Sequence, residues 1–108
     1  MIIGNGLAPY RFTDAINEIS LREINVSTAY PNPFNPVTSI DYSVNASTNV
    51  KIAIYDVVGR VVDVIEDDFK INGEYSVTWN AINKASGIYY ISIQTDNEVY
   101  SQKVVLLK

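Results

Sequence analysis

Apolar and polar residues alternate with a period of two over most of the chain after residue 23. Successive side chains of a β-strand point to opposite faces of a sheet, so this period predicts strands with one buried face. The positions expected to share the inward side are Ile24, Val26, Thr28 and Tyr30, then Ile40, Tyr42 and Val44, then Val50, Ile52 and Ile54, then Tyr75, Val77 and Trp79, and then Tyr89, Ile91 and Ile93.

Turn-forming residues separate these segments. Asp56-Val57-Val58-Gly59 has Asp at the first and Gly at the fourth position of a type I turn, which predicts a hairpin onto a strand at residues 60–66. That strand has apolar residues on both sides, which indicates that both of its faces are covered. Asn72-Gly73 and Asp96-Asn97 are further turn signals, and the second predicts that a last strand at residues 98–107 pairs with one at residues 88–95.

These segments together indicate the fold class. Seven strands with no helix between them predict an all-β fold, a seven-stranded antiparallel immunoglobulin-like β-sandwich over residues 24–108. Residues 1–23 do not follow the period of two. Phe12, Ile16 and Ile19 have helical spacing with Thr13 placed as a cap, but a helix this short is marginal without packing. We therefore expect residues 1–23 to be a linker or the tail of an upstream region.

Prolines are concentrated between the first two expected strands. Three of the four prolines of the chain lie in Tyr30-Pro31-Asn32-Pro33-Phe34-Asn35-Pro36. Proline fixes its own φ, donates no backbone hydrogen bond and holds the preceding residue in extended geometry. The stretch is therefore expected to be a stiff, extended connection that is neither helix nor central strand.

Composition excludes several classes of function. The formal net charge of −4 argues against a surface for nucleic acid or for an anionic membrane, since either would need a basic patch. The chain has no cysteine and no histidine, which removes thiolate metal sites and serine–histidine or cysteine–histidine catalysis. No apolar run approaches the ~20 residues of a membrane span. No cofactor is expected.

The acidic run Glu66-Asp67-Asp68 is the one candidate for a metal site, because calcium prefers carboxylate oxygens. The residue spacing of a calcium-binding loop does not surround it. We expect instead a solvated strand end that discourages edge-to-edge pairing.

Five motifs in a fixed order resemble a known family. Each motif is short, and the ordered set is what is specific. The motifs are Tyr30-Pro31-Asn32-Pro33-Phe34-Asn35-Pro36 with Thr38, Ile40 and Tyr42; Ile54-Tyr55-Asp56 with Gly59-Arg60-Val61-Val62; Gly73-Glu74-Tyr75 with Trp79-Asn80; Ser86-Gly87-Ile88-Tyr89-Tyr90; and Gln102-Lys103-Val104-Val105-Leu106-Leu107-Lys108. Residues 24–108 thereby resemble the C-terminal sorting domain of type IX secretion cargo, in the type A form found in Gram-negative bacteria.

The resemblance implies a role in protein export. Members of this family have no catalytic activity of their own and follow an upstream cargo domain that reaches the periplasm by a cleavable signal peptide. The outer-membrane secretion translocon recognises the folded domain, and a sortase-like surface peptidase usually removes it. The cargo is expected at the cell surface or in the medium, and any cleavage is expected within residues 1–23.

The motifs supply the candidate recognition residues. Among the turn residues, Arg60 best distinguishes a recognition role from a purely structural one, because a turn does not require arginine after its glycine. The last run is apolar on both faces of a strand, so we hypothesise that its uncovered side is a docking edge. The candidates are Pro31, Asn32, Pro33, Phe34, Asn35, Pro36, Asp56, Gly59, Arg60, Gly73, Gly87, Lys103, Val104, Val105, Leu106, Leu107 and Lys108.

Other classes of function stay open from the residues alone. One alternative is a carbohydrate- or protein-binding module with an aromatic platform, in which Tyr55 and Tyr90 fall on outward positions. A structural subunit that assembles by edge-strand pairing is another. An enzyme is disfavoured, because no carboxylate pair is brought together by its spacing. The platform residues would be Tyr30, Phe34, Tyr55, Tyr90 and Tyr100.

Overall fold

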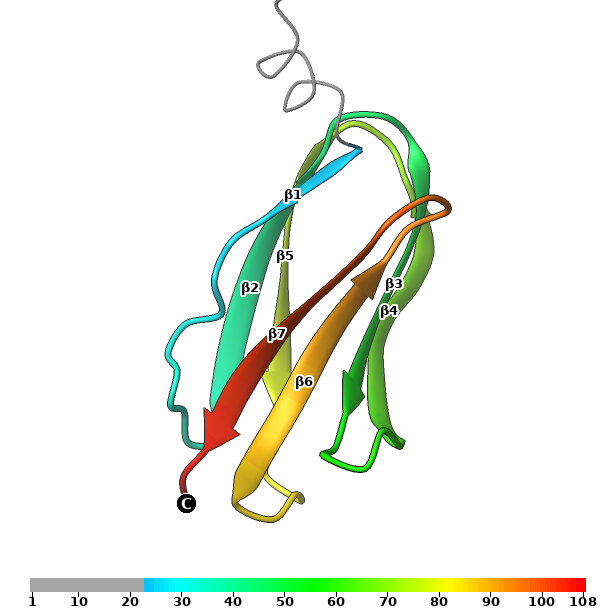
Figure 1. Ribbon diagram of the computed structural model, residues 1–108. Helices are drawn as coiled ribbons and strands as arrows, with labels where there is room; N and C mark the ends of the chain where they lie inside the picture. Colours follow the sequence, from blue (N-terminus) through cyan, green and yellow to red (C-terminus); the bar gives the residue numbers. More distant parts are fainter. Residues whose placement is uncertain (1–22) are drawn as a thin grey trace, which may run out of the picture.

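Seven antiparallel strands form two facing sheets in a computed structural model that describes residues 23–108 (Figure 1). The strands are β1 (Ile24–Val26), β2 (Val37–Val44), β3 (Thr48–Tyr55), β4 (Val61–Lys70), β5 (Gly73–Asn80), β6 (Gly87–Gln94) and β7 (Val99–Leu106). One sheet has the order β1-β2-β5 and the other β4-β3-β6-β7. The predicted all-β sandwich of immunoglobulin-like type is confirmed. The helical spacing noted at residues 12–19 lies outside the described residues.

The strand registers define two ends of the sandwich. Ile24 lies opposite Val44, which lies opposite Gly73, so these residues mark one end, called here the β1 end. At the other end, called the C-terminal end, Gly87 starts β6 opposite Leu106, where β7 finishes. Figure 1 shows that the turn between β3 and β4 and the loop between β5 and β6 also lie at the C-terminal end.

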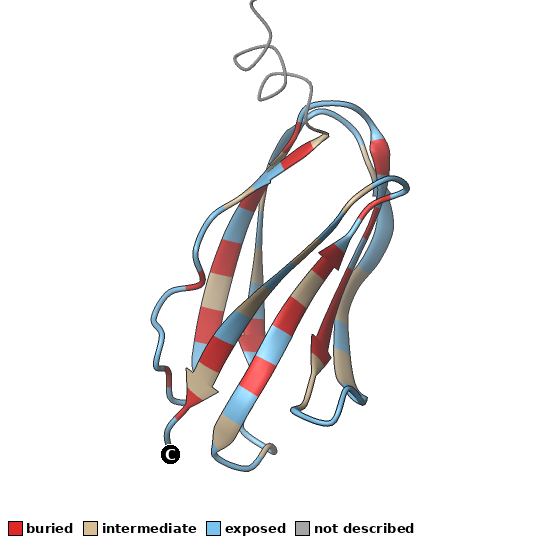
Figure 2. Cartoon of the chain, viewed as in Figure 1, coloured by how far each residue is buried: buried red, intermediate tan, exposed pale blue. Residues whose placement is uncertain are grey.

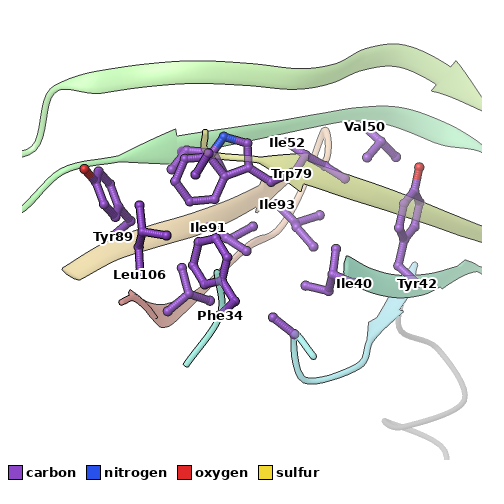
Figure 3. Packing of buried hydrophobic residues seen from close by; sticks show 14 of the residues in the cluster. Phe34, Ile40, Tyr42, Val50, Ile52, Trp79, Tyr89, Ile91, Ile93 and Leu106 are labelled. Atoms are coloured by element: carbon purple, nitrogen blue, oxygen red, sulfur yellow. The ribbon is translucent and has the colours of Figure 1, made fainter. Parts of the chain in front are cut away.

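Inward-facing residues of both sheets form one core. Figure 2 shows β6 banded in buried and exposed positions, as its sequence period predicts. Trp79 lies in the core against Phe34 and Tyr89, with ring centroids 5.5 Å and 5.3 Å away (Figure 3). The buried cluster consists of Ile24, Ala29, Phe34, Ile40, Tyr42, Val44, Val50, Ile52, Ile54, Trp79, Ala81, Tyr89, Ile91, Ile93, Val104 and Leu106.

The first strand is shorter than its sequence pattern predicts. Val26 lies opposite Tyr42 and Tyr30 opposite Ser39, so four steps on this segment face three steps on β2. An additional residue in a strand reverses the facing of the residues after it. Ala29 is therefore buried and Tyr30 is 80% exposed, so the expectation that Thr28 and Tyr30 face inward is wrong.

The fourth strand was predicted at residues 60–66 with both faces covered, and both expectations are wrong. It runs from Val61 to Lys70, and Val61 and Val64 are 52% and 46% exposed. Its register against β3 shifts between Ile52 and Ala53 and again between Ile54 and Tyr55. These bulges, and not burial on both faces, explain why its apolar residues do not alternate.

The acidic run lies inside β4, which is an edge strand, and not at a strand end. Glu66 Oε2 accepts an ion-pair hydrogen bond from Lys70 Nζ at 2.7 Å. Charges and bulges on an edge strand both disfavour pairing with another chain. Within residues 23–108 no group of three or more acidic side chains is placed to hold a metal ion.

Candidate recognition surface

The proline-rich segment joins the two sheets along one side of the sandwich. At its start, Tyr30 exchanges backbone hydrogen bonds with Ser39 of β2. Further along the segment, the Phe34 N–H donates to the Val105 carbonyl at 2.9 Å and the Leu107 N–H donates to the Phe34 carbonyl at 3.0 Å. The chain thus leaves one sheet and pairs with the last strand of the other. Bends and isolated bridges replace the stiff, extended geometry expected here.

Asn32 extends this pairing through its side chain. Its Nδ2 donates to the Lys103 carbonyl at 3.1 Å, and its Oδ1 accepts from the Val105 N–H at 3.0 Å. The outer edge of β7 is therefore occupied over residues 103–107. The expectation that this edge is uncovered is wrong for that stretch, because a strand added there would displace Asn32 and Phe34.

Several candidate recognition residues belong to the core. Phe34 is 2% exposed, and Val104 and Leu106 are 0% exposed, so their side chains stabilise the fold and are not available to a partner. Phe34 is also removed from the aromatic platform proposed above. Tyr100 lies opposite the buried Ile93 and so faces away from Tyr55 and Tyr90. The five aromatic residues therefore do not form one surface.

The turn between β3 and β4 is organised by the Asp56 carboxylate. Oδ1 accepts from the backbone N–H groups of Val58 and Arg60, each at 3.0 Å, and Oδ2 accepts from Arg60 Nε at 2.9 Å. The backbone N–H of Arg60, assisted by its guanidinium and the Val58 N–H, lowers the pKa of Asp56. Gly59 has φ of +88°, which side-chain-bearing residues rarely adopt. The predicted hairpin is confirmed.

Arg60 remains accessible although it is paired. Its side chain is 79% exposed while that of Asp56 is 15% exposed. The carboxylate thus holds one edge of the guanidinium near the turn, and the rest of that group faces solvent. A planar group with several donors, partly fixed in direction, is suited to bind carboxylates or carbonyl groups of a partner.

Other exposed groups surround this turn at the C-terminal end. A hollow of about 290 Å³ lies between the turn and the start of β6. Lys108 is fixed beside it, because its backbone N–H donates to Ser86 Oγ at 2.9 Å and its Nζ donates to the Ile82 carbonyl at 2.6 Å. The exposed apolar residues here are Val57, Val58, Ile82 and Leu107, at 67%, 69%, 59% and 56%.

Sequence reasoning missed three of these apolar residues. Val57, Val58 and Ile82 were not among the candidates, although valines at the central positions of a turn were a visible signal. Gly87 lies at this C-terminal end with Arg60, whereas Gly73 lies at the β1 end. Folding therefore gathers most of the candidate residues at one end and leaves Gly73 apart.

A polar groove lies on the other sheet of the sandwich. A hollow of about 580 Å³ forms a groove on the outer face of the β1-β2-β5 sheet, and it is lined mainly by small polar residues and by Asp41 and Glu74. The described part of the chain contains no helix long and apolar enough to cross a membrane.

Comparisons with known proteins agree with this architecture. In solved structures, the chain is similar to dimeric latent PorU from Porphyromonas gingivalis, with a TM-score of 0.57 and 15% identity over 81% of this chain. The match spans only 10% of that much longer chain, and it concerns the fold. No curated protein matches the sequence. The model of the family described as the secretion system C-terminal sorting domain matches residues 28–107, and this chain therefore belongs to that family of type IX secretion sorting domains.

Proposed function

We propose that this domain is a non-catalytic signal that directs an attached cargo through the type IX secretion translocon to the cell surface or the medium. We further propose that the translocon binds the C-terminal end of the folded sandwich. The observation that carries this proposal is the position of Arg60, exposed and held by Asp56 among exposed apolar side chains. Arginine beside apolar groups is typical of residues that dominate binding energy in protein interfaces.

The recognised form is the folded domain and not a linear peptide. Arg60, Ile82 and Lys108 are far apart in sequence and lie at the same end of the domain only because β3, β5 and β7 all finish there. The buried members of the family motifs, Phe34 and Leu106 among them, then act indirectly by maintaining this end.

A cargo attached upstream of the domain would not block binding of the translocon to the C-terminal end. Glu23, the first residue that the structure describes, lies at the β1 end, because its carbonyl accepts from the Asn45 N–H and Ile24 is paired with Val44. A cargo attached there leaves the C-terminal end free. A sortase-like surface peptidase would cleave within residues 1–23.

A fusion experiment tests the proposal. All 108 residues are attached to a reporter with a signal peptide and expressed in a bacterium with type IX secretion. We expect the reporter outside the cell, and about tenfold less of it for Arg60→Ser, the loss of one interface hot spot. Lys51→Ser is the matched control, an exposed cation in the half of β3 toward the β1 end.

The two results against the proposal have different meanings. A wild-type fusion that stays in the periplasm would overturn the role as an export signal. Wild-type export with equal export of Arg60→Ser would overturn only the role of Arg60. The Asp56–Arg60 ion pair is exposed to solvent and contributes little to stability, so a folded variant is expected. Circular dichroism of both purified variants checks this.

A further inference from the structure

The outer face of the β4-β3-β6-β7 sheet is apolar in the half nearest the C-terminal end. Tyr55 lies opposite both Tyr90 and Val61, and Ala53 lies opposite Val64, so these side chains form adjacent rows on one face. These side chains are accessible to solvent, because Val61 is 52%, Val64 46% and Tyr90 37% exposed. Ile88, opposite Val105, continues the face at 40% exposure. Tyr55, Tyr90, Val61, Val64 and Ile88 are called here the tyrosine face.

Ala53 lies on the same face, opposite Val64 on one side and Ser92 on the other. It points outward with its neighbours in register but is only 3% exposed, so the longer side chains around it cover it. The corresponding face of the β1-β2-β5 sheet is different. There Ser39, Asp41 and Ser43 lie opposite Thr78, Ser76 and Glu74. A soluble sheet face is normally polar in this way, and a contiguous apolar face marks an interaction site.

The charges beside the tyrosine face are positive. Lys103 lies directly opposite Tyr90, and Arg60 immediately precedes Val61. The two acidic residues described in this half of the molecule are engaged internally. Asp56 binds its own turn, and Asp63 Oδ2 accepts from Trp79 Nε1 at 3.0 Å. The face therefore has an apolar centre and a positive rim with no opposing acid presented beside it.

Most of the acidic residues lie in the other half, toward the β1 end. Those on or beside the strands there are Glu23, Asp41, Glu66, Asp67, Asp68, Glu74, Asp96 and Glu98. A net acidic chain thus presents its apolar face in the one region where its exposed charges are basic. Such an arrangement orients the domain toward an acidic surface as it approaches, because complementary charges steer association.

We propose that the tyrosine face binds a protein surface with an apolar centre and an acidic rim. This inference rests on the proposed function and makes the partner a component of the export machinery. Tyrosine, aliphatic residues and a flanking cation match the composition of protein-interface cores. A sugar is disfavoured as the partner, because aliphatic side chains (Val61, Val64 and Ile88) make up most of the exposed surface beside the tyrosines. A second copy would bring the same positive rim against its own.

Two variants test the face. Tyr90→Ser should reduce export of the reporter fusion about tenfold, and Lys103→Glu should do the same by opposing the acidic rim. Tyr30→Ser and Lys51→Glu are the matched controls, because Tyr30 is exposed elsewhere and Lys51 lies on the same sheet face in its acidic half. Both controls should export within about twofold of wild type. Thermal unfolding verifies that all four variants fold.

Photo-crosslinking tests the chemistry of the partner. A photoreactive phenylalanine at position 90 in the exported fusion should crosslink to an envelope protein, at a peptide containing Asp or Glu, and the same group at position 30 should not. A crosslink only to a second copy, or to a glycan, would overturn the inference. So would normal export of both Tyr90→Ser and Lys103→Glu. Failure of the wild-type fusion to be exported would instead overturn the proposed function.

Discussion

The side chain of Asn32 pairs with Val105 as a neighbouring strand would. Its Oδ1 accepts the Val105 N–H at 3.0 Å while its Nδ2 donates to the Lys103 carbonyl at 3.1 Å. Two motifs at opposite ends of the sequence are thus parts of one structural unit. The proline-rich segment covers the last strand, and the last strand in turn fixes the segment.

Replacing Asn32 tests this pairing. Asn32→Ala removes a donor and an acceptor from β7 and should lower the free energy of unfolding by about 1 kcal/mol, the usual net value of such hydrogen bonds. Asn35→Ala is the control, an exposed asparagine in the same segment, and should change stability by less than about 0.5 kcal/mol. Urea denaturation measures both. Equal stability of the two variants would contradict the pairing.

Phe34 should contribute more to stability than any exposed aromatic residue of its segment. Phe34→Ala leaves a cavity beside Trp79 and should cost about 3–5 kcal/mol, as buried phenylalanines do. Tyr30→Ala, at a site 80% exposed, should cost little. Thermal or urea unfolding distinguishes them. A small effect of Phe34→Ala would mean that the segment does not pack against the core in solution.

The success of the sequence pattern depended on regular pairing. β2, β5 and β6 pair without a register shift along their ladders, so the period of two placed Ile40, Val77 and Ile91 on the correct side. Where a bulge intervenes, the period fails, as at Ala29 and across β4. A bulge depends on what the partner strand offers, and a single segment does not contain that information.

For the candidate recognition surface too, contacts between nearby residues could be predicted from the sequence and contacts between distant residues could not. Asp56, Gly59 and Arg60 act within five residues, so their turn could be predicted from local chemistry. The role of Asn32 could not, because its partners are more than seventy residues away. Alternation placed Tyr55 and Tyr90 outward, but only the register of β3 with β6 puts them side by side.

Gly59 should be required for the conformation of its turn. Its φ of +88° is strained for a residue with a Cβ, although no atom lies within 4 Å of the position that a Cβ would take. Gly59→Ala should therefore cost about 1 kcal/mol or slightly more from backbone strain alone. Val58→Ala, one residue earlier and exposed, should be nearly neutral. Paired unfolding curves give the comparison, and a neutral Gly59→Ala would contradict the left-handed geometry.

Asp56 should make the stability of the domain sensitive to acid. Its pKa is lowered from the ordinary value of 3.8, chiefly by the backbone N–H of Arg60. A lowered pKa stabilises the folded state above the unfolded pKa, and this contribution is lost as the pH falls through the folded pKa. The stability difference between wild type and Asp56→Asn should therefore shrink as the pH falls below about 5.

A second variant distinguishes the effect of the Arg60 backbone N–H on the pKa of Asp56 from the effect of the Arg60 guanidinium. Because the backbone N–H of Arg60 is the largest cause of the lowered pKa, Arg60→Gln should retain most of this acid sensitivity. Urea unfolding of the three proteins across the pH series measures it. If Arg60→Gln abolished the sensitivity as completely as Asp56→Asn, the guanidinium would be the main partner of the carboxylate. The same substitution leaves Asp56 to organise the turn, so any loss of export in Arg60→Gln would report on the exposed guanidinium and not on a disrupted hairpin.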